Sequence, residues 1–459
     1  MIVLKNFHIV DENTDTFGTV IIEGGVIKEV IAESNDGLDY VLNEKKIECC
    51  CLEARLVIDG RNYIHPEIPY KQSLLPVLMP ALVDLHAHFR DPGFPEKETL
   101  ESASLAAAAG GYGTLVCMAN TKPVNDSIEK IAALKKRSDA LGLIDLYPAM
   151  SLTKNMEGRE LSELTKLPPY TGNSSPLLPR LLSEDGKDIA GDSLFITAMR
   201  EAKRSGLPLS CHCDFGGEEA EILKREGKPR SLWSRIEENN AARRVIELNK
   251  ETGCKLHIAH VSTREAVEMI RRAKKEGMPL SAEASPHHIG CTEEDAQRLG
   301  EESSGRVNPP LRSEEDRQAL VNAILDGTID AIATDHAPHS RSDKEAGAPG
   351  FSGLETAFSL CYTELVLKNN MDLRRLSALM SAAPSGILGF GGNDPCGRGR
   401  IAPGLRADLI SVDLRQKITV DPASFRSRGK NSPFTGRELR GRILVNINRG
   451  RIIYEDKNV

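Results

Sequence analysis

The sequence predicts an α/β protein: a (β/α)8 TIM-like barrel with a small β-sandwich domain built from both termini. Two observations lead to this fold class. Both ends of the chain are rich in β-forming residues, whereas the middle alternates short apolar runs with segments long enough to be helices. In addition, 459 residues exceed what one hydrophobic core usually organises, so a large domain and a smaller one are expected.

The two chain ends each contain β-rich runs joined by turns. Residues 18–31 hold two such runs around a Glu-Gly-Gly turn, and residues 442–454 hold two more around Asn-Arg-Gly. These turn sequences are typical of the connection between paired strands. We therefore expect residues 1–80 and 391–459 to form one composite β domain.

Five apolar runs mark expected strands in the middle region, residues 81–390. They cover residues 113–118, 207–212, 255–260, 278–283 and 329–335, and helical stretches separate several of them. Repeated strand and helix units favour a parallel α/β barrel over an open sheet, although the pattern alone does not decide between them. Residues 167–179 are rich in Pro, Ser and Gly and are expected to form a loop.

The charge balance argues against two classes of partner. The chain has 59 basic and 66 acidic residues, a formal net charge of −7, which offers no general attraction to nucleic acid or to anionic membranes. The first residues lack the basic start and apolar stretch of a signal peptide. No apolar run approaches the roughly 20 residues that span a bilayer. We expect a cytoplasmic protein with neither nucleic acid nor a membrane as its partner.

The ten cysteines are not spaced like a disulfide framework, and we expect reduced thiols. The triplet Cys49-Cys50-Cys51 could indicate metal or redox chemistry. No partner cluster follows it at zinc-site spacing, however. Buried or edge cysteines without such a role are the favoured interpretation.

Histidines and one aspartate stand where the apolar runs end. His86 and His88 are two residues apart, so in an extended strand their imidazoles would share one face. Alone, such a pair is more often an ordinary strand feature than a metal site. Other runs, however, end in His212, His260 and Asp335, and a barrel collects the carboxyl ends of its strands on one rim. Because imidazole and carboxylate bind zinc-like cations, the sequence predicts a metal site on that rim.

Each of these residues also has a plain structural explanation. His212, between two cysteines, could be a buried histidine with satisfied hydrogen bonds, and Asp335 could cap the start of a helix. His257 lies three residues before His260, so we expect it on the opposite face of the strand, in the outer layer against the helices. Plain explanations would have to hold at every strand end at once, which favours the metal site.

Taken together, the motifs resemble those of the amidohydrolase superfamily and, within it, of the shorter bacterial type of dihydroorotase. The resemblance covers nearly the whole chain and is highly specific. The resembling segments, in family order, are 84–93 (DLHAHFRDPG), 118–124 (MANTKPV), 183–186 (SEDG), 260–263 (HVST), 284–288 (ASPHH), 308–312 (NPPLR), 333–339 (ATDHAPH) and 429–434 (GKNSPF).

The resemblance implies a centre with two Zn²⁺ ions per subunit. The implied ligands are His86, His88 and Asp335 for one ion and His212 and His260 for the other. A carboxylate would bridge the ions: many relatives use a carboxylated lysine, whereas this type uses an aspartate, which matches Asp185. The family usually shows two aspartates before the following glycine, and here the first is Glu184. His287 and His288 would lie behind the ligands or in a loop.

The resemblance also implies an activity, the reversible interconversion of dihydroorotate and N-carbamoyl-L-aspartate in de novo pyrimidine (UMP) biosynthesis. A metal-bridging hydroxide would attack the ring carbonyl, and Asp335 would shuttle the proton to the leaving nitrogen. A buried substrate carboxylate needs a cationic partner, and Arg90 matches the family's carboxylate binder. The other implied substrate contacts are His88, Asn120, Asn308, His339, Pro349 and Gly350.

Some features depart from the family pattern or leave other functions open. Ala119 stands where proline is common, Ser285 where threonine is common, and the segment 35–75 is longer than usual. One alternative is another cyclic amidase, acting on hydantoins, dihydropyrimidines or allantoin, whose metals a carboxylated lysine typically bridges. The other is a non-catalytic scaffold, although such relatives have usually lost metal ligands. We expect a homodimer. An association with aspartate carbamoyltransferase is left open.

Overall fold

The computed structural model describes residues 1–33, 44, 46–51, 53–63, 75–170, 175–212, 214, 217–391 and 397–457. Most of the segment 35–75 and part of the expected loop at 167–179 therefore lie outside the described residues. The described residues of that loop form neither helix nor strand. In the part of the chain that is described, no helix is both long and apolar enough to cross a membrane.

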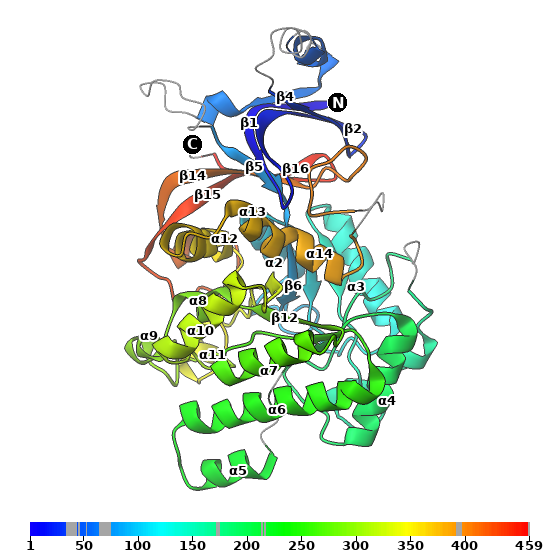
Figure 1. The fold of residues 1–459 in the computed structure, drawn as a ribbon, viewed down its shortest axis with the longest axis vertical. Helices are drawn as coiled ribbons and strands as arrows, with labels where there is room; N and C mark the ends of the chain where they lie inside the picture. The colour runs from blue at the N-terminus through cyan, green and yellow to red at the C-terminus, as the bar shows by residue number, and fades with distance from the viewer. Residues whose placement is uncertain are drawn as a thin grey trace.

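Strands from both chain ends form one hydrogen-bonded sheet at the top of Figure 1, in the order β16-β15-β14-β5-β1-β2-β3 with β4 paired to β1. Apolar residues from both halves of this sheet share one core, which includes Phe7, Ile22, Leu409 and Leu444. The expected small β domain built from both termini is therefore confirmed. Its strands are β1 (Ile2–Val10), β2 (Asp15–Glu23), β3 (Val26–Ala32), β4 (Leu56–Asp59), β5 (Val77–Pro80), β14 (Leu409–Thr419), β15 (Glu438–Asn448) and β16 (Arg451–Glu455).

Both turns expected from the sequence join neighbouring antiparallel strands. Gly24 and Gly25 connect β2 to β3 with φ angles of 62° and 85°. Arg449 and Gly450 connect β15 to β16 with φ angles of 51° and 68°. Two successive residues at positive φ make the tight turn that matches the twist of paired strands, which is why glycine occurs at both turns.

Eight parallel strands close into a barrel next to this sheet. Two ladders, β6-β7-β8 and β9-β10-β11-β12-β13, are joined by single bridges between Met150 and Leu182 and between Ala87 and His336. The circle is thereby closed, so the barrel is confirmed over the open sheet. Its strands are β6 (Leu82–Ala87), β7 (Tyr112–Cys117), β8 (Asp145–Pro148), β9 (Leu182–Ser183), β10 (Leu209–Cys211), β11 (Leu256–Ile258), β12 (Leu280–Ala284) and β13 (Ala331–Ile332).

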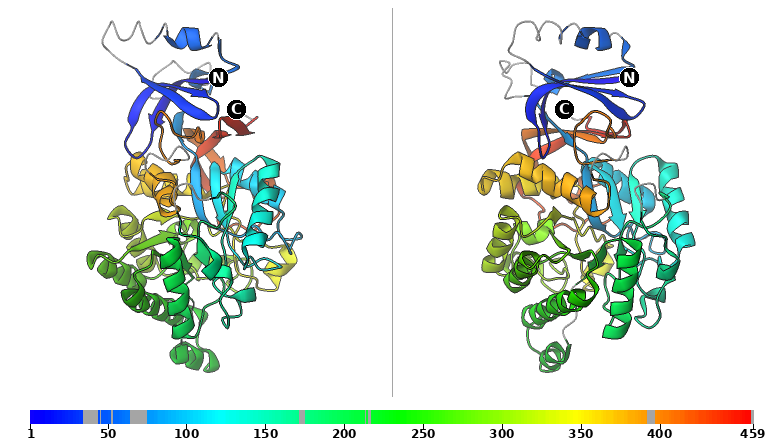
Figure 2. Two further views of the ribbon diagram at one scale, coloured as in Figure 1. Left: turned by 90° about the vertical axis from the view of Figure 1, so that its right-hand side faces the viewer. Right: turned by 45° about the vertical axis from the view of Figure 1, so that its right-hand side comes forward.

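Helices surround the barrel (Figures 1 and 2). Polar caps and glycines set several of their ends: Thr263 accepts from the third backbone N–H of its helix, and Gly206 ends another in the left-handed conformation. The helices are α2 (Leu100–Ala109), α3 (Ile128–Leu141), α4 (Asp192–Ser205), α5 (Gly217–Arg225), α6 (Arg230–Thr252), α7 (Arg264–Lys275), α8 (Pro286–Gly290), α9 (Glu293–Leu299), α10 (Glu314–Leu325), α11 (Arg341–Glu345), α12 (Ala357–Cys361), α13 (Leu373–Ser377) and α14 (Ala383–Ile387). Two π-helical stretches, Tyr362–Lys368 and Ala378–Ala382, follow α12 and α13.

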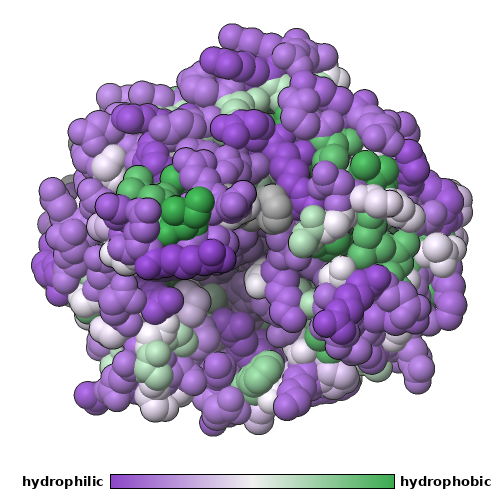
Figure 3. Space-filling view, turned by 90° about the horizontal axis from the view of Figure 1, so that it is seen from below, coloured by the Kyte–Doolittle hydropathy of each residue, from purple (hydrophilic) through white to green (hydrophobic). Residues whose placement is uncertain are grey.

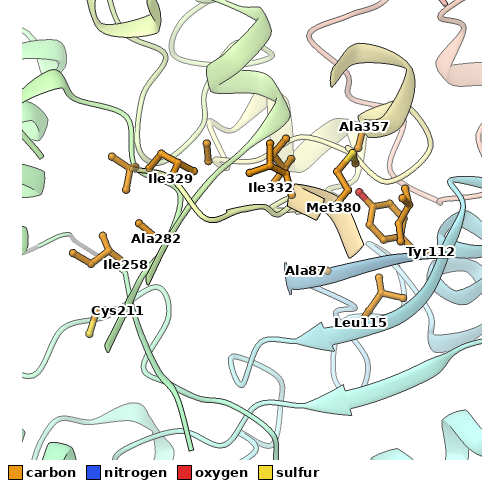
Figure 4. Packing of buried hydrophobic residues seen from close by; sticks show 14 of the residues in the cluster. Ala87, Tyr112, Leu115, Cys211, Ile258, Ala282, Ile329, Ile332, Ala357 and Met380 are labelled. Atoms are coloured by element: carbon orange, nitrogen blue, oxygen red, sulfur yellow. The ribbon is translucent and has the colours of Figure 1, made fainter. Parts of the chain in front are cut away.

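The largest hydrophobic core lies between the strands of the barrel and these helices. Leu115, Cys211, Ile258 and Ile332 contribute to it from four different strands (Figure 4). Because successive side chains of a strand alternate between faces, the residues between these apolar ones point to the inside of the barrel. The packing therefore fixes which strand residues can reach the barrel interior.

The cysteine triplet lies in a helical stretch, residues 46–51, rather than in a strand. Cys49 is exposed, and Cys50 and Cys51 are partly exposed. The expectation of buried or edge cysteines is therefore wrong. Among the described residues, the groups that could hold a metal ion do not include this triplet.

Candidate metal centre and substrate pocket

Six residues expected to bind metal come together at the carboxyl ends of the barrel strands. His86 lies in β6 and His88 just after it, and the other four follow β9, β10, β11 and β13. All six are nearly inaccessible to solvent; His86, for example, is 1% exposed. The six residues are His86, His88, Asp185, His212, His260 and Asp335.

The carboxylate of Asp185 lies at the centre of this cluster. Its Oδ1 is 3.3 Å from both His86 Nε2 and His212 Nδ1 and 3.9 Å from His260 Nε2, and its Oδ2 is 3.5 Å from His88 Nε2. One carboxylate therefore faces four imidazoles, three through Oδ1 and one through Oδ2. It lies within reach of both sets of histidines that are expected to bind metal.

Asp335 approaches the same cluster from the end of β13. Its Oδ1 is 3.3 Å from His88 Nε2 and 3.7 Å from His86 Nε2. Two triplets have ligand atoms that all lie within 4.8 Å of one another: His86, His88 and Asp335, and His86, Asp185 and His260. His212 is in neither triplet, but its Nδ1 atom is 2.8 Å from His260 Nε2. It therefore lies beside the second triplet.

Two of these residues have an unusual backbone conformation. The φ angles of His260 and Asp335 are +32° and +46°, a region that costs a non-glycine residue on the order of 1 kcal/mol or more. Both residues follow the last regular residue of their strand. The turn in the backbone directs their side chains to the cluster instead of continuing the alternation of the strand.

The buried polar atoms of the cluster fit a cation. Three of them, His86 Nε2, Asp185 Oδ1 and His260 Nδ1, have no hydrogen-bond partner, and unpaired buried polar atoms are costly. Imidazole nitrogen and carboxylate oxygen are the donors that zinc and similar ions prefer. The donor set and its unpaired atoms are therefore compatible with a metal centre.

The charges in the cluster act strongly on one another. Burial raises the pKa of Asp185, but the charge of His86 and the close approach of His212 and His260 hold it well below its usual value. Burial likewise lowers the pKa of His86, and Asp185, Glu283 and Asp335 more than offset this and raise it well above normal. The carboxylates of the cluster therefore stay ionised.

Sequence reasoning missed Glu283, which lies in β12 and is 1% exposed. Nδ1 of His86 donates to its Oε1 at 3.1 Å, and Nε2 of His257 donates to its Oε2 at 3.0 Å. The other nitrogen of His257 is 2.8 Å from Ser281 Oγ. The clue in the sequence is an acidic residue at the end of the apolar run 278–283.

The expected position of His257 in the outer layer is wrong. Its neighbours in β11, Leu256 and Ile258, belong to the outer core, whereas His257 contacts Glu283 inside the barrel. Side chains alternate between faces only within the regular strand, but β11 ends at Ile258 and His260 has a positive φ. Both histidines therefore lie on the inner side of the barrel wall.

Arg90 and His339 lie together beside the metal cluster. Arg90 Nη2 is 3.1 Å from His339 Nε2, and Arg90 Nε donates to the Pro338 carbonyl at 3.3 Å. Asn120 reaches the cluster itself: its Oδ1 accepts from His88 Nδ1 at 3.0 Å, and its Nδ2 donates to Asp185 Oδ2 at 3.4 Å. The Arg90 guanidinium, beside His339 and two residues after His88, offers a binding place for an anionic group.

Asn308 approaches the cluster at His212. Its Nδ2 donates to Asp214 Oδ2 at 3.1 Å and is 3.2 Å from His212 Nε2. Arg230 donates to its Oδ1 at 3.3 Å. The peptide bond from Asn308 to Pro309 is cis. The structure therefore brings Asn308 to His212, one of the expected metal ligands.

Pro349 and Gly350 are joined to the same pocket through the backbone. The Pro349 carbonyl accepts from His339 Nε2 at 3.0 Å. Gly350 has a φ of +137°, and a Cβ there would lie 2.6 Å from Ala337. No other residue could occupy this position without moving the segment that follows Asp335.

His287 and His288 lie in α8, behind the cluster. Ser285 Oγ is 2.9 Å from His287 Nε2 and 2.6 Å from His288 Nδ1, and His288 Nε2 donates to the Pro309 carbonyl at 3.1 Å. His287 Nε2 is 4.0 Å from Asp335 Oδ2. These histidines contact the surroundings of the centre and are not part of either ligand triplet.

An eight-stranded parallel barrel with histidines and carboxylates gathered at the carboxyl ends of its strands is the architecture of a barrel enzyme. The face of the molecule opposite the small domain is largely polar and hollowed near its centre (Figure 3). The fold and the site together therefore define a barrel enzyme.

Comparisons with known proteins define the family. The model of the amidohydrolase family matches residues 77–453. The chain is 37% identical over 455 residues to a dihydroorotase of Clostridium botulinum, covering 99% of each chain, and 39% identical over 392 residues to a dihydroorotase of Caldanaerobacter subterraneus, covering 82% of this chain and 86% of that protein. The chain belongs to the amidohydrolase family and is a hydrolase.

Solved structures support the same fold. An L-hydantoinase (dihydropyrimidinase) from Arthrobacter aurescens superposes with a TM-score of 0.79 at 25% identity, covering 99% of this chain and 96% of that one. A D-hydantoinase (dihydropyrimidinase) from a Thermus species gives a TM-score of 0.77 at 22% identity, with the same coverage. The barrel and the composite β domain are therefore shared with known family structures.

Proposed function

We propose that this hydrolase acts on cyclic amides and that its substrate is dihydroorotate, which it interconverts reversibly with N-carbamoyl-L-aspartate in de novo pyrimidine biosynthesis. The observation that carries the proposal is the position of Arg90 beside the metal cluster, with its Nη2 3.1 Å from His339 Nε2. A ring amide held at the cluster could place a carboxylate on Arg90. The names of the relatives at 37% and 39% identity agree with this substrate.

The proposed cofactor is zinc, two ions per subunit. His86, His88 and Asp335 would hold one ion, His212 and His260 the other, and Asp185 would bridge them, as its place between four imidazoles suggests. Two bound metal ions supply an activated water at neutral pH and polarise a carbonyl group. We further propose a cytoplasmic homodimer.

The proposed role of Asp335 is proton transfer. In ring opening, an oxygen from water bonds to the amide carbon, the bond from that carbon to the ring nitrogen breaks, and the nitrogen takes up a proton. Asp335 Oδ1 points to His86 and His88, so the carboxylate lies at the edge of the centre, where it can accept the proton of the attacking water and pass it to the nitrogen. Ring closure reverses these transfers.

The remaining residues bind and orient the substrate. Arg90 would form a two-pronged contact with the carboxylate, with His339 beside it. Asn120, fixed by His88 and Asp185, would orient the ring at the centre. Asn308, which contacts His212, and the backbone of Pro349, which contacts His339, would line the rest of the pocket together with the adjoining Gly350.

The rival proposal is hydrolysis of hydantoins or dihydropyrimidines, which the names of the matched structures suggest. Two residues favour dihydroorotate. Arg90 supplies a cation that a ring without a carboxylate would leave unpaired, and a buried unpaired charge is costly. Asp185 occupies the place where the resemblance would put a carboxylated lysine in the rival enzymes.

The test is an assay of dihydroorotate ring opening and of N-carbamoyl-L-aspartate ring closure, before and after treatment with a chelator, with the metal content measured. Turnover that disappears with the metal and returns on addition of zinc supports the proposal. Hydrolysis of hydantoin or allantoin without turnover of dihydroorotate would overturn it. Intact protein with neither bound metal nor activity would instead favour the scaffold alternative.

A further inference from the structure

Lys344 is a buried ammonium group near the substrate pocket that the proposed chemistry does not use. It lies in α11 and is 3% exposed. Its Nζ donates to three backbone carbonyls, those of Arg306 at 2.8 Å, Ala348 at 2.7 Å and Gly350 at 3.0 Å. An ammonium has three N–H donors, and here each has an acceptor. A buried charge satisfied by main-chain carbonyls fixes the backbone around it.

The backbone of Gly350 is held from several directions. Its N–H donates to the Arg306 carbonyl at 3.0 Å. Its carbonyl accepts from Lys344 and also from Asn431 Nδ2, at 3.2 Å. Asn431 belongs to the segment that leads into β15, and its own carbonyl accepts from the backbone N–H of Ser352 at 2.8 Å. Lys344 and Asn431 therefore hold one carbonyl from two parts of the chain.

This held backbone reaches the pocket through Pro349. The Pro349 carbonyl, one residue before Gly350, accepts from Nε2 of His339 at 3.0 Å. Burial and the charges of Arg90, Lys97 and Lys344 lower the pKa of His339 to about 3, so its ring is neutral and has one N–H. With that hydrogen on Nε2, His339 cannot accept from Arg90 Nη2, which lies 3.1 Å away. Nη2 of Arg90 is left free to donate to a ligand, while Nε donates to the Pro338 carbonyl.

We propose that Lys344 is a positioning residue for the substrate carboxylate: by holding Gly350, it keeps the Pro349 carbonyl against His339 and leaves Arg90 free to bind the carboxylate. This inference rests on the proposed function, because it assigns the position of a carboxylated substrate. Lys344 itself lies away from the metal cluster and touches no proposed metal ligand. The role is therefore one of substrate binding rather than of bond breaking.

The charged groups that face Lys344 are cations. Burial, Arg306 and Arg230 lower the pKa of its ammonium to about 7, and His339 is neutral. The ring of Phe351, 5.5 Å from Nζ, is the aromatic contact. Loss of the proton would remove one of three donors from the backbone, so the binding of a carboxylated ligand should weaken as the pH rises above about 7.

The experiment compares Lys344→Met, Asn431→Ala and the control Arg341→Met with the wild type, all in the full-length, zinc-loaded enzyme. Arg341 lies in the same helix, but its side chain is 93% exposed and pairs with Glu345. Steady-state kinetics with dihydroorotate give kcat and KM separately, and metal analysis and thermal unfolding report on the centre and the fold. The Lys344→Met variant keeps most of the length of the side chain and removes the donors.

We expect Lys344→Met to raise KM about 10- to 100-fold, which corresponds to a lost charged hydrogen bond, with kcat within about threefold and zinc content unchanged. Asn431→Ala should raise KM less, and Arg341→Met should leave both constants unchanged. In the wild type, KM should rise above pH 7, and in Lys344→Met this dependence should disappear.

Two results would overturn the inference. One is a folded Lys344→Met variant with wild-type KM; the other is a loss of kcat and zinc with KM unchanged, which would make Lys344 a structural support of the centre. If Lys344→Met does not fold, an unchanged KM in Asn431→Ala overturns it. Failure of the proposed function is seen separately, as a wild type that does not turn over dihydroorotate.

Discussion

Glu283 holds His86 from behind the metal cluster, with its Oε1 3.1 Å from Nδ1 of the imidazole. The second oxygen of the same carboxylate accepts from His257, and both contacts lower the pKa of Glu283 to about 2 against the effect of burial. A hydrogen bond at Nδ1 fixes the tautomer that leaves Nε2 free to bind a metal. Nε2 of His86 is indeed unpaired and faces Asp185.

Replacement of Glu283 by Gln should weaken zinc binding about 10- to 100-fold, the usual effect of losing the partner of a metal-bound histidine. The amide presents a donor where one histidine also donates, so one of the two contacts is lost. Competition with a coloured chelator measures the affinity. Ser281→Ala removes only the contact between Ser281 Oγ and His257, which does not involve Glu283 itself. It should weaken zinc binding less. Equal zinc affinity in Glu283→Gln and wild type would contradict the role.

Asp185→Asn tests the proposed bridge. The substitution keeps the shape of the side chain but removes the charge that faces four imidazoles. We expect zinc content to fall from two ions toward one or fewer and kcat to fall by at least about 100-fold, since the loss should exceed that of a residue behind the ligands. Glu184→Gln is the matched control, because its carboxylate instead binds the backbone of Leu152 and Thr153. Full zinc and full rate in Asp185→Asn would rule out the bridge.

Arg90→Met tests the proposed carboxylate contact. Loss of a charge-assisted, two-pronged contact should raise KM for dihydroorotate about 100-fold, with zinc content unchanged. Arg137→Met is the control, because Arg137 is about half exposed and pairs with Asp91. Steady-state kinetics and metal analysis give both quantities. A KM within threefold of wild type would show that the carboxylate binds elsewhere.

The sequence was sufficient to predict the barrel, the composite β domain and the residues that meet at the strand ends. The reason is physical: a parallel barrel places every strand end on one rim, so residues such as His86 and Asp335 meet although they lie far apart in the chain. The tight turns at Gly24-Gly25 and Arg449-Gly450 are also predictable, because each depends only on a short local sequence.

What the sequence could not predict depends on backbone geometry and on contacts between distant segments. The face of the strand on which His257 lies is not predictable by counting from His260. Side chains stop alternating between faces before His260, where φ is +32°. The support of Gly350 by Lys344 and Asn431 joins segments that no local pattern relates. The exposure of the cysteine triplet follows from the helical stretch in which it lies, whereas its spacing in the sequence favours buried or edge cysteines.

Asp145 lies at the start of β8, at the junction of the barrel with the small domain, and is 1% exposed. Its carboxylate binds Arg398 at 2.6 Å and also Arg406 and Arg449. Burial raises the pKa of Asp145, but these arginines and Lys135 hold it well below its usual range. A depressed carboxyl pKa adds stability that is present above the unfolded pKa of about 3.9 and is lost as the pH falls below it.

Asp145→Asn should therefore lower the free energy of unfolding at pH 7 by about 3–5 kcal/mol, because it leaves buried cations unpaired. The difference from wild type should shrink as the pH is lowered below about 4, where the wild-type carboxyl group begins to lose its advantage. Urea unfolding of the metal-free proteins at pH 7 and at pH 3 measures both effects. Asp139→Asn is the control, because Asp139 pairs with Lys135 nearer the surface. Equal stability of Asp145→Asn and wild type at pH 7 would show that the arginines are stabilised by other contacts.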